Sequence, residues 1–139
     1  MALLKFHTQR TDTRTHEERQ ESLGLGRLGE QMATKYLEDN GYVILERNYH
    51  KGHLEIDIIA LDGKDLVVIE VKSRGYDAIM RPEDAVGHEK RMNMIRLANQ
   101  FVKSHGRKEN VRFDIVAIVK NEHGVELNHI KNAFNVMQF

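Results

Sequence analysis

The chain contains no cysteine, only one proline, and no excess of either charge sign. Without cysteine it has no disulfides, zinc thiolate sites or thiol nucleophiles, so a bound metal would need carboxylate, carbonyl or imidazole ligands. Such ligands favour hard cations. Lys plus Arg and Asp plus Glu each number 21, so any contact with nucleic acid has to come from a local basic patch.

Long hydrophobic runs are also missing. No apolar run reaches the roughly 18 residues of a membrane helix, and the hydrophobic start of the chain is too short for a secretory signal. We therefore expect a cytoplasmic protein with no membrane partner. The 139 residues suffice for one globular domain. The polar residues 1–21 are expected to form either a mobile arm or the frayed start of a helix, which leaves residues 22–139 as the folded domain.

Two segments place apolar side chains at helical spacing, so each presents one stripe for burial. The first segment runs from Ser22 to the Asn40-Gly41 stop signal, and its stripe comprises Leu25, Leu28, Met32, Ala33, Tyr36 and Leu37. The second is expected to begin at Pro82 and to end before the break at 104–110, and its stripe comprises Ala85, Val86, Met94, Ile95, Ala98, Phe101 and Val102.

Five short segments are rich in valine and isoleucine and are separated by turn residues, which is typical of β-strands. They cover residues 42–49, 54–61, 65–72, 112–120 and 125–130. The resulting order, α-β-β-β-α-β-β, predicts an α/β protein with a mixed central β-sheet flanked by helices, because each helix needs a sheet face on which to bury its stripe.

The second and third expected strands form a hairpin that brings two acidic side chains together. A turn at residues 63–64 pairs Leu61 with Leu66 for a loop of either two or four residues. Because side chains alternate along a strand, the same register places Asp57 opposite Glu70. Opposed Cβ atoms lie about 5 Å apart, where like charges repel unless a cation separates them. The pair therefore predicts a divalent metal site, with Mg²⁺ or Mn²⁺ as the cofactor.

Two further residues complete the expected active site. Lys72 follows Glu70 on the same strand face, near enough to contact an attacking water or to stabilise negative charge on phosphorus. Glu30 falls at the margin of the first helix's apolar stripe, from which it reaches the metal directly or through water. Mg²⁺ held by one or two carboxylates keeps positions for water and substrate phosphate, so this set indicates phosphodiester hydrolysis.

The same residues carry a resemblance to a known superfamily. The run Ile69-Glu70-Val71-Lys72-Ser73-Arg74, preceded by Glu55-Ile56-Asp57-Ile58-Ile59-Ala60 and by Gly29-Glu30 on a helix, resembles the PD-(D/E)XK nucleases. Within that superfamily the chain is similar, from about Gly26 to Phe134, to the bacterial YraN-like family, which is similar to archaeal Holliday junction resolvases. One position departs from the family pattern: Leu54 stands where the family usually has glycine.

The resemblance implies a restriction-endonuclease-like fold with an α-β-β-β-α-β core. It also implies that Asp57, Glu70 and Lys72 take the core nuclease positions and that Glu30 is the additional helix carboxylate. Junction resolvases of this superfamily act as dimers, since a junction offers two symmetric strands, so a homodimer is expected from resemblance and symmetry.

Other charged residues admit both a functional and a structural interpretation. Glu55 is expected opposite Lys72, which favours a supporting ion pair over a metal role. Four basic residues are candidate phosphate contacts: Arg74, Arg81, Lys90 and Arg91. Acidic neighbours make a solvated helix face equally consistent with the sequence, except at Arg74, which lies just past the catalytic strand.

Three functions follow from these features. The first is a Mg²⁺- or Mn²⁺-dependent endonuclease acting on DNA, with branched or single-stranded forms as candidate substrates. The second is a module that keeps the nuclease fold and binds nucleic acid within a recombination, repair or uptake complex without cutting it. The third is a structural subunit whose paired carboxylates bind an ion only for stability.

Overall fold

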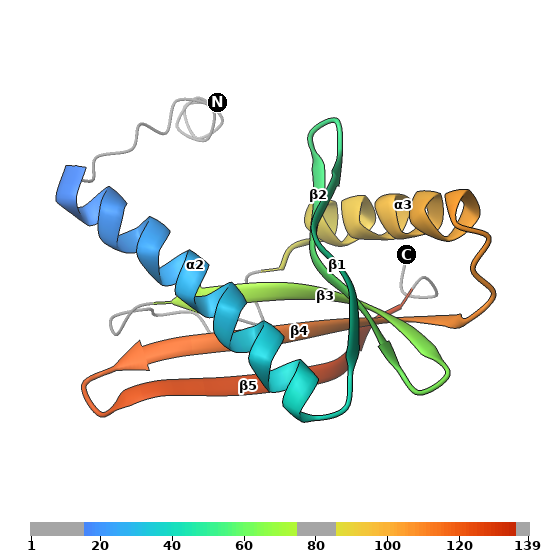
Figure 1. Cartoon of the computed structure of the whole chain (residues 1–139). Helices are drawn as coiled ribbons and strands as arrows, with labels where there is room; N and C mark the ends of the chain where they lie inside the picture. Colours follow the sequence, from blue (N-terminus) through green and yellow to red (C-terminus); the bar gives the residue numbers. More distant parts are fainter. Residues whose placement is uncertain (1–15, 75–85, 136–139) are drawn as a thin grey trace.

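The computed structural model describes residues 16–74 and 86–135, with the side chains of residues 17–25 and of Arg74 outside the described part (Figure 1). The elements are α2 (His16–Asp39), β1 (Val43–Lys51), β2 (Leu54–Asp62), β3 (Asp65–Arg74), α3 (His88–Ser104), β4 (Asn110–Asn121) and β5 (Gly124–Phe134). This order is the one that hydrophobic periodicity predicts.

The strands form one five-stranded sheet in the order β1-β2-β3-β4-β5. Neighbouring strands are antiparallel except β3 and β4, which are parallel because the chain returns through α3 between them. The protein is therefore an α/β protein with a mixed sheet and two helices in its described part. This architecture is compatible with a restriction-endonuclease-like fold.

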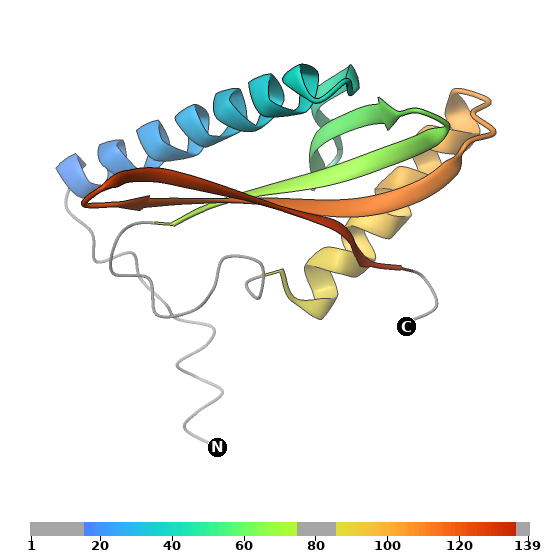
Figure 2. The same ribbon diagram turned by 90° about the horizontal axis from the view of Figure 1, so that it is seen from below.

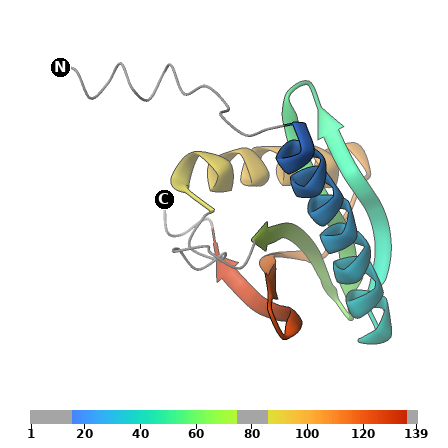
Figure 3. The same ribbon diagram turned by 90° about the vertical axis from the view of Figure 1, so that its left-hand side faces the viewer.

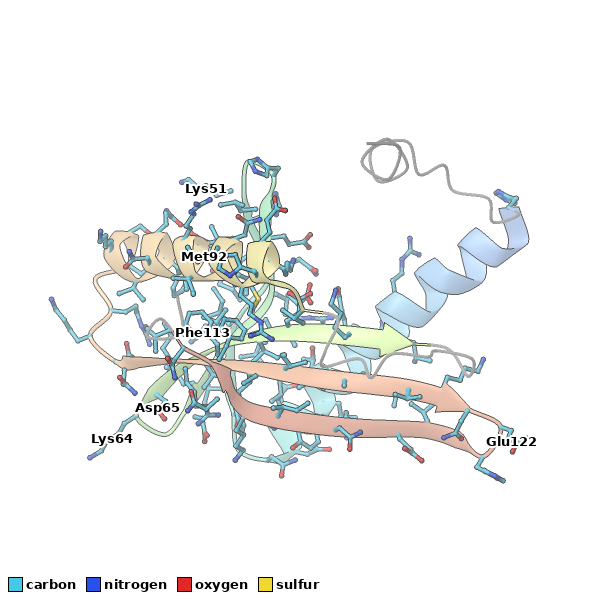
Figure 4. All side chains as sticks on the ribbon, turned by 180° about the vertical axis from the view of Figure 1, so that it is seen from behind. Lys51, Lys64, Asp65, Met92, Phe113 and Glu122 are labelled. Carbon is cyan, nitrogen blue, oxygen red and sulfur yellow. The ribbon has the colours of Figure 1, made fainter. Side chains whose placement is uncertain are left out.

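The two helices cover opposite faces of the sheet (Figure 2). On the α2 face the buried residues are Ala33, Leu37, Tyr42, Ile58, Ala60, Val67, Ile69, Val116 and Ile118. On the α3 face they are Ile56, Ile59, Leu66, Val68, Val86, Met94, Leu97, Ala98, Phe101, Phe113, Ile115 and Phe134. Figure 4 shows Phe113 between α3 and the sheet. Since both faces are covered, β3 is apolar along most of its length, and a charged residue on it is conspicuous.

The β1–β2 hairpin turns away from β4 and β5, and its tip rises to the level of α3 (Figures 1 and 3). Tyr49 of β1 fastens this hairpin to α3. Its hydroxyl donates to Gln100 Oε1 at 2.6 Å, and its ring packs edge-on against Phe101 at a centroid distance of 5.1 Å. The tip of the hairpin therefore lies away from β3. The first part of β2 is not paired with β3, and the candidate site lies where the two strands separate.

The helix boundaries differ from the prediction at both N-termini. Helix α2 begins at His16, six residues before the expected start at Ser22, and Leu28 of the expected buried stripe is 47 % exposed. Helix α3 begins at His88 rather than at Pro82, which lies outside the described residues. Val86 is buried all the same, because an apolar side chain next to the helix reaches the α3-side core without being helical.

Candidate active site

The site lies at the point where β2 separates from β3. Leu61 pairs with Leu66 as predicted, and the β2–β3 ladder ends at the pair Ile58–Ile69. One more residue in this register places Asp57 opposite Glu70. The ladder ends there because Val71 N–H donates to Asp57 Oδ2 at 2.8 Å, where a continuing ladder would offer a backbone carbonyl. This hydrogen bond holds the Asp57 carboxylate at the fork.

Glu70 is a charged residue in an otherwise apolar stretch of β3, and it is only 4 % exposed. Two ammonium groups approach it: Lys72 Nζ lies 3.9 Å from Oε1 and Lys90 Nζ lies 3.4 Å from Oε2. Oε2 is buried and accepts no hydrogen bond from the described residues. A buried carboxylate oxygen without a hydrogen bond is costly, so this atom has unused capacity to bind a ligand.

The electrostatic environment of Glu70 is unusual. Burial, followed by the charge of Asp57, raises the pKa of Glu70 to about 8, and Lys90 and Lys72 lower it only in part. Two carboxylates that are opposed across a ribbon cannot both be ionised cheaply, so one keeps a proton unless a cation is present. Perturbed acids of this kind are concentrated at functional sites.

Helix α2 brings Glu30 to the same region. Burial and then the charges of Asp57 and Glu55 raise the pKa of Glu30 above its usual value, whereas Arg47 and the side chain of Asn48 lower it. The helix packs so closely on β3 here that a methyl group added at Gly29 would overlap Ser73 Oγ. The glycine before Glu30 therefore allows the close approach that puts this carboxylate near the fork.

The donor set matches what a hard divalent cation uses. Asp57 and Glu70 supply oxygen ligands, one of them a buried atom without a hydrogen bond, and Glu30 is close enough for electrostatic repulsion from Asp57. Within residues 16–74 and 86–135 no group of three His, Asp or Glu side chains is preformed for a metal. Mg²⁺ tolerates this, since it commonly binds through one or two carboxylates and fills its octahedron with water.

Glu55 does not form the predicted ion pair. It is exposed and faces His50 across the β1–β2 ladder, and no ion pair joins it to Lys72 among the described side chains. Because the β2–β3 ladder ends at Ile58–Ile69, Glu55 and Lys72 are never opposed. Lys72 contacts Glu70 on its own strand instead.

The candidate phosphate contacts have different environments. The Arg74 side chain and all of Arg81 lie outside the described part of the chain. Lys90 faces Glu70, which sequence spacing does not reveal. Arg91 packs on the core: its Nε donates to Val86 O at 2.8 Å, and its guanidinium carbon lies 5.3 Å from the Phe134 ring centroid. In this conformation the Arg91 guanidinium stabilises the α3 side of the fold.

A second polar cluster lies within the sheet around Asp114 and was not predicted from the sequence. Asp114 is fully buried and accepts two hydrogen bonds from Arg112, both at 2.9 Å. Because a carboxylate only accepts, His129 Nε2–H donates to Asp114 at 2.7 Å, and the Tyr36 hydroxyl lies 3.0 Å from His129 Nδ1. Asn132 N–H donates to Asp114 at 3.0 Å. Since both oxygens of Asp114 accept hydrogen bonds, this cluster is structural.

The fold and the site together define a class of protein: an α/β protein with a mixed sheet, compatible with restriction endonucleases, in which carboxylates and lysines converge at a strand fork. The chain belongs to a family within that description. Residues 29–118 match the model described as "Uncharacterised protein family UPF0102", which covers the helix carboxylate, the hairpin, α3 and most of β4.

The chain also matches bacterial relatives over nearly their whole lengths. A UPF0102 protein of Parabacteroides distasonis is 42 % identical over 110 residues, which is 79 % of this chain and 91 % of the relative. One of Syntrophus aciditrophicus is 43 % identical over 117 residues, covering 84 % and 92 %. One of Persephonella marina is 41 % identical over 112 residues, covering 80 % and 93 %. Neither helix of the described chain is long and apolar enough to span a membrane.

Proposed function

We propose that this protein is a Mg²⁺- or Mn²⁺-dependent endonuclease that hydrolyses phosphodiester bonds in DNA. One observation carries the proposal: Glu70, buried and raised in pKa by burial and by the Asp57 charge, follows the last β2–β3 pair and has two lysine ammonium groups beside it. Opposed acids next to ammonium groups suit a cation and a phosphate bound side by side.

Each residue has a distinct role in this proposal. Asp57 and Glu70 hold the cation, and Glu30 contributes a third carboxylate directly or through water. A bound divalent ion supplies Lewis-acid chemistry, lowering the pKa of water and offsetting phosphate charge. Lys72, whose side chain is 25 % exposed, presents its ammonium group to the developing negative charge on phosphorus or to the attacking water.

Lys90 of α3 lies 3.4 Å from Glu70 and offsets part of the charge that the acids of the site carry. Its 37 % exposed side chain is also free to turn toward a phosphate when a cation takes its place at Glu70. This role modifies the phosphate contact expected for Lys90 from the sequence. DNA with branched or single-stranded character, bound by a homodimer, remains the substrate and assembly that we propose.

The proposal is tested by titrating Mg²⁺ and Mn²⁺ into cleavage assays on junction, flap, single-stranded and duplex DNA. The wild type should cut at least one of these, and Asp57→Asn should lower the rate by a factor of about 10² or more, because it removes a ligand and its charge. Asp39→Asn is the matched control, since Asp39 is exposed and its ion-pair partner among the described residues is Lys35. Equal rates for wild type and Asp57→Asn would contradict the proposal.

A second candidate function is a DNA-binding module that no longer cuts. The ion pair between Lys90 and Glu70 favours it, because an ammonium group already occupies the face of the carboxylate that a metal would use. The lack of a preformed three-carboxylate cluster in the described chain points the same way. Salt-dependent DNA binding without cleavage by any metal on any of the four substrates would establish this alternative.

A further inference from the structure

Asn48 has an unusual backbone conformation for a residue within a strand. Its φ is +52°, in the left-handed region, and among the described non-glycine residues only Asn132 shares this feature. Asparagine tolerates the left-handed region better than most residues, yet the conformation still carries strain. Strain of this kind persists where the surrounding structure holds it, and it is frequent at functional sites.

The sheet register places Asn48 next to the acids. The β1–β2 ladder pairs Arg47 with Ile58 and Tyr49 with Ile56, so the residue between them, Asn48, is opposite Asp57. Asp57 in turn is opposite Glu70 when the β2–β3 register continues by one residue. Asn48, Asp57 and Glu70 therefore occupy adjacent positions on three neighbouring strands.

The side chain of Asn48 reaches the third acid. It lies close enough to the Glu30 carboxylate of α2 to lower the pKa of that acid, and Arg47 beside it adds an attractive charge. Asp57 and Glu55 repel the same carboxylate. Without a donor and a positive charge from β1, this repulsion would favour rotation of Glu30 toward solvent. The left-handed backbone at Asn48 thus coincides with a side-chain contact to a candidate ligand.

We propose that Asn48 is a positioning residue that holds the Glu30 carboxylate beside Asp57, so that the cation site is assembled from α2, β2 and β3 together. The expected effect on cation binding rests on the proposed function. The Asn48–Glu30 contact itself can be measured without a metal. Partners in the outer shell of metal sites commonly change affinity by 10- to 100-fold when removed.

The decisive variant is Asn48→Gly, because glycine adopts the left-handed backbone without strain and deletes only the amide. Calorimetric titration with Mn²⁺ should show binding about 10-fold weaker than in wild type. Asn132→Gly is the matched control, since Asn132 has the same φ of +52° and contributes only its backbone N–H to Asp114. Equal Mn²⁺ affinity in wild type and Asn48→Gly would overturn the proposal.

A double variant separates positioning from a general effect on the fold. If Asn48 acts through Glu30, adding Asn48→Gly to Glu30→Gln should weaken Mn²⁺ binding no further than Glu30→Gln alone. A full additional 10-fold loss would show that Asn48 acts independently of Glu30 and would contradict the positioning role. Circular dichroism spectra matching those of the wild type establish that each variant is folded.

A metal-free measurement distinguishes failure of this inference from failure of the proposed function. The side-chain amide resonances of Asn48 in a ¹⁵N–¹H correlation spectrum should shift in Glu30→Gln, while those of Asn132 stay in place. Unmoved Asn48 resonances would overturn the contact. Absence of any Mn²⁺ binding by wild type, together with shifted Asn48 resonances, would overturn the proposed function and leave the positioning of Glu30 supported.

Discussion

Lys90 Nζ lies 3.4 Å from Glu70 Oε2, so a lysine from α3 pairs with the buried acid of β3. Lys72, two residues from Glu70 on its own strand, is farther from it at 3.9 Å. The larger favourable charge on Glu70 thus comes from across the interface between helix and sheet. Glu70 nevertheless keeps a pKa of about 8, because burial and Asp57 outweigh both lysines.

The raised pKa predicts how stability depends on pH in the metal-free protein. The unfolded chain releases the Glu70 proton near pH 4.5 and the folded chain near pH 8. The contribution of protonated Glu70 to the free energy of unfolding is therefore complete below pH 4.5 and is lost as pH rises through about 8. Glu70→Gln should therefore gain stability relative to wild type between pH 5 and 9, by about 1–3 kcal/mol, as measured by urea denaturation.

The matched control for this prediction is Glu38→Gln on the exposed face of α2. Its stability difference from wild type should vary far less over the same pH range. If the free energy of unfolding of Glu70→Gln ran parallel to that of the wild type from pH 5 to 9, the prediction would be refuted, and so would the raised pKa of Glu70.

Divalent cations should stabilise the folded protein, since they bind the assembled acids and not the unfolded chain. At 100 times the dissociation constant the gain is about 2.7 kcal/mol, which raises the melting temperature by several degrees. Scanning calorimetry with Mg²⁺ or Mn²⁺ measures it. Asp57→Asn should lose most of the increase, and Asp39→Asn should keep it.

The same melting curves address the purely structural alternative. If the acids only bind an ion for stability, the metal should raise the melting temperature and added DNA should change nothing. A further increase with metal and DNA together is the outcome expected for a nucleic-acid-directed site.

Alanine substitutions at two glycines of α2 test how closely this helix, which bears Glu30, packs on β3. Gly29→Ala puts a methyl group into Ser73 Oγ and close to the Ile118 side chain, so it should destabilise the protein by about 1–3 kcal/mol. Gly26→Ala meets no atom within 4 Å and should stabilise the helix by about 0.5–1 kcal/mol. Chemical denaturation distinguishes them. Equal effects of the two substitutions would rule out the close contact between α2 and β3.

The buried cluster around Asp114 predicts a large structural effect without loss of the site chemistry. Asp114→Asn leaves Arg112 without its buried partner and should cost about 3 kcal/mol, or roughly 10 °C in melting temperature. Burial raises the Asp114 pKa, but hydrogen bonds from His129, Arg112 and Asn132 outweigh it and lower the pKa below its usual value. The stabilisation is thus present above about pH 4 and is lost as pH falls through the lowered pKa.

Asp39→Asn again provides the comparison, because its ion pair with Lys35 is exposed and should contribute less than about 1 kcal/mol. If Asp114→Asn and Asp39→Asn had the same melting temperature in thermal scans at pH 7, the buried cluster would contribute little to stability.

Much of the architecture could be predicted from the sequence. The strand order along the chain, the central sheet and the Leu61–Leu66 register follow from an alternation of period two and from turn residues that are close in sequence. The opposition of Asp57 and Glu70 follows from that register alone. Helix starts were less predictable, since α3 begins at His88 without a side-chain cap and α2 extends to His16 through a polar segment.

The sequence by itself determined which acids meet across the β2–β3 hairpin, because local turn geometry sets that pairing. Only the tertiary structure decided that Lys90 pairs with Glu70, that Arg91 packs on Phe134, and that Glu55 never meets Lys72. These contacts depend on how α3 packs on the sheet and where β2 leaves β3. Both arise from burial of apolar surface over long sequence separations, which no local pattern of residues encodes.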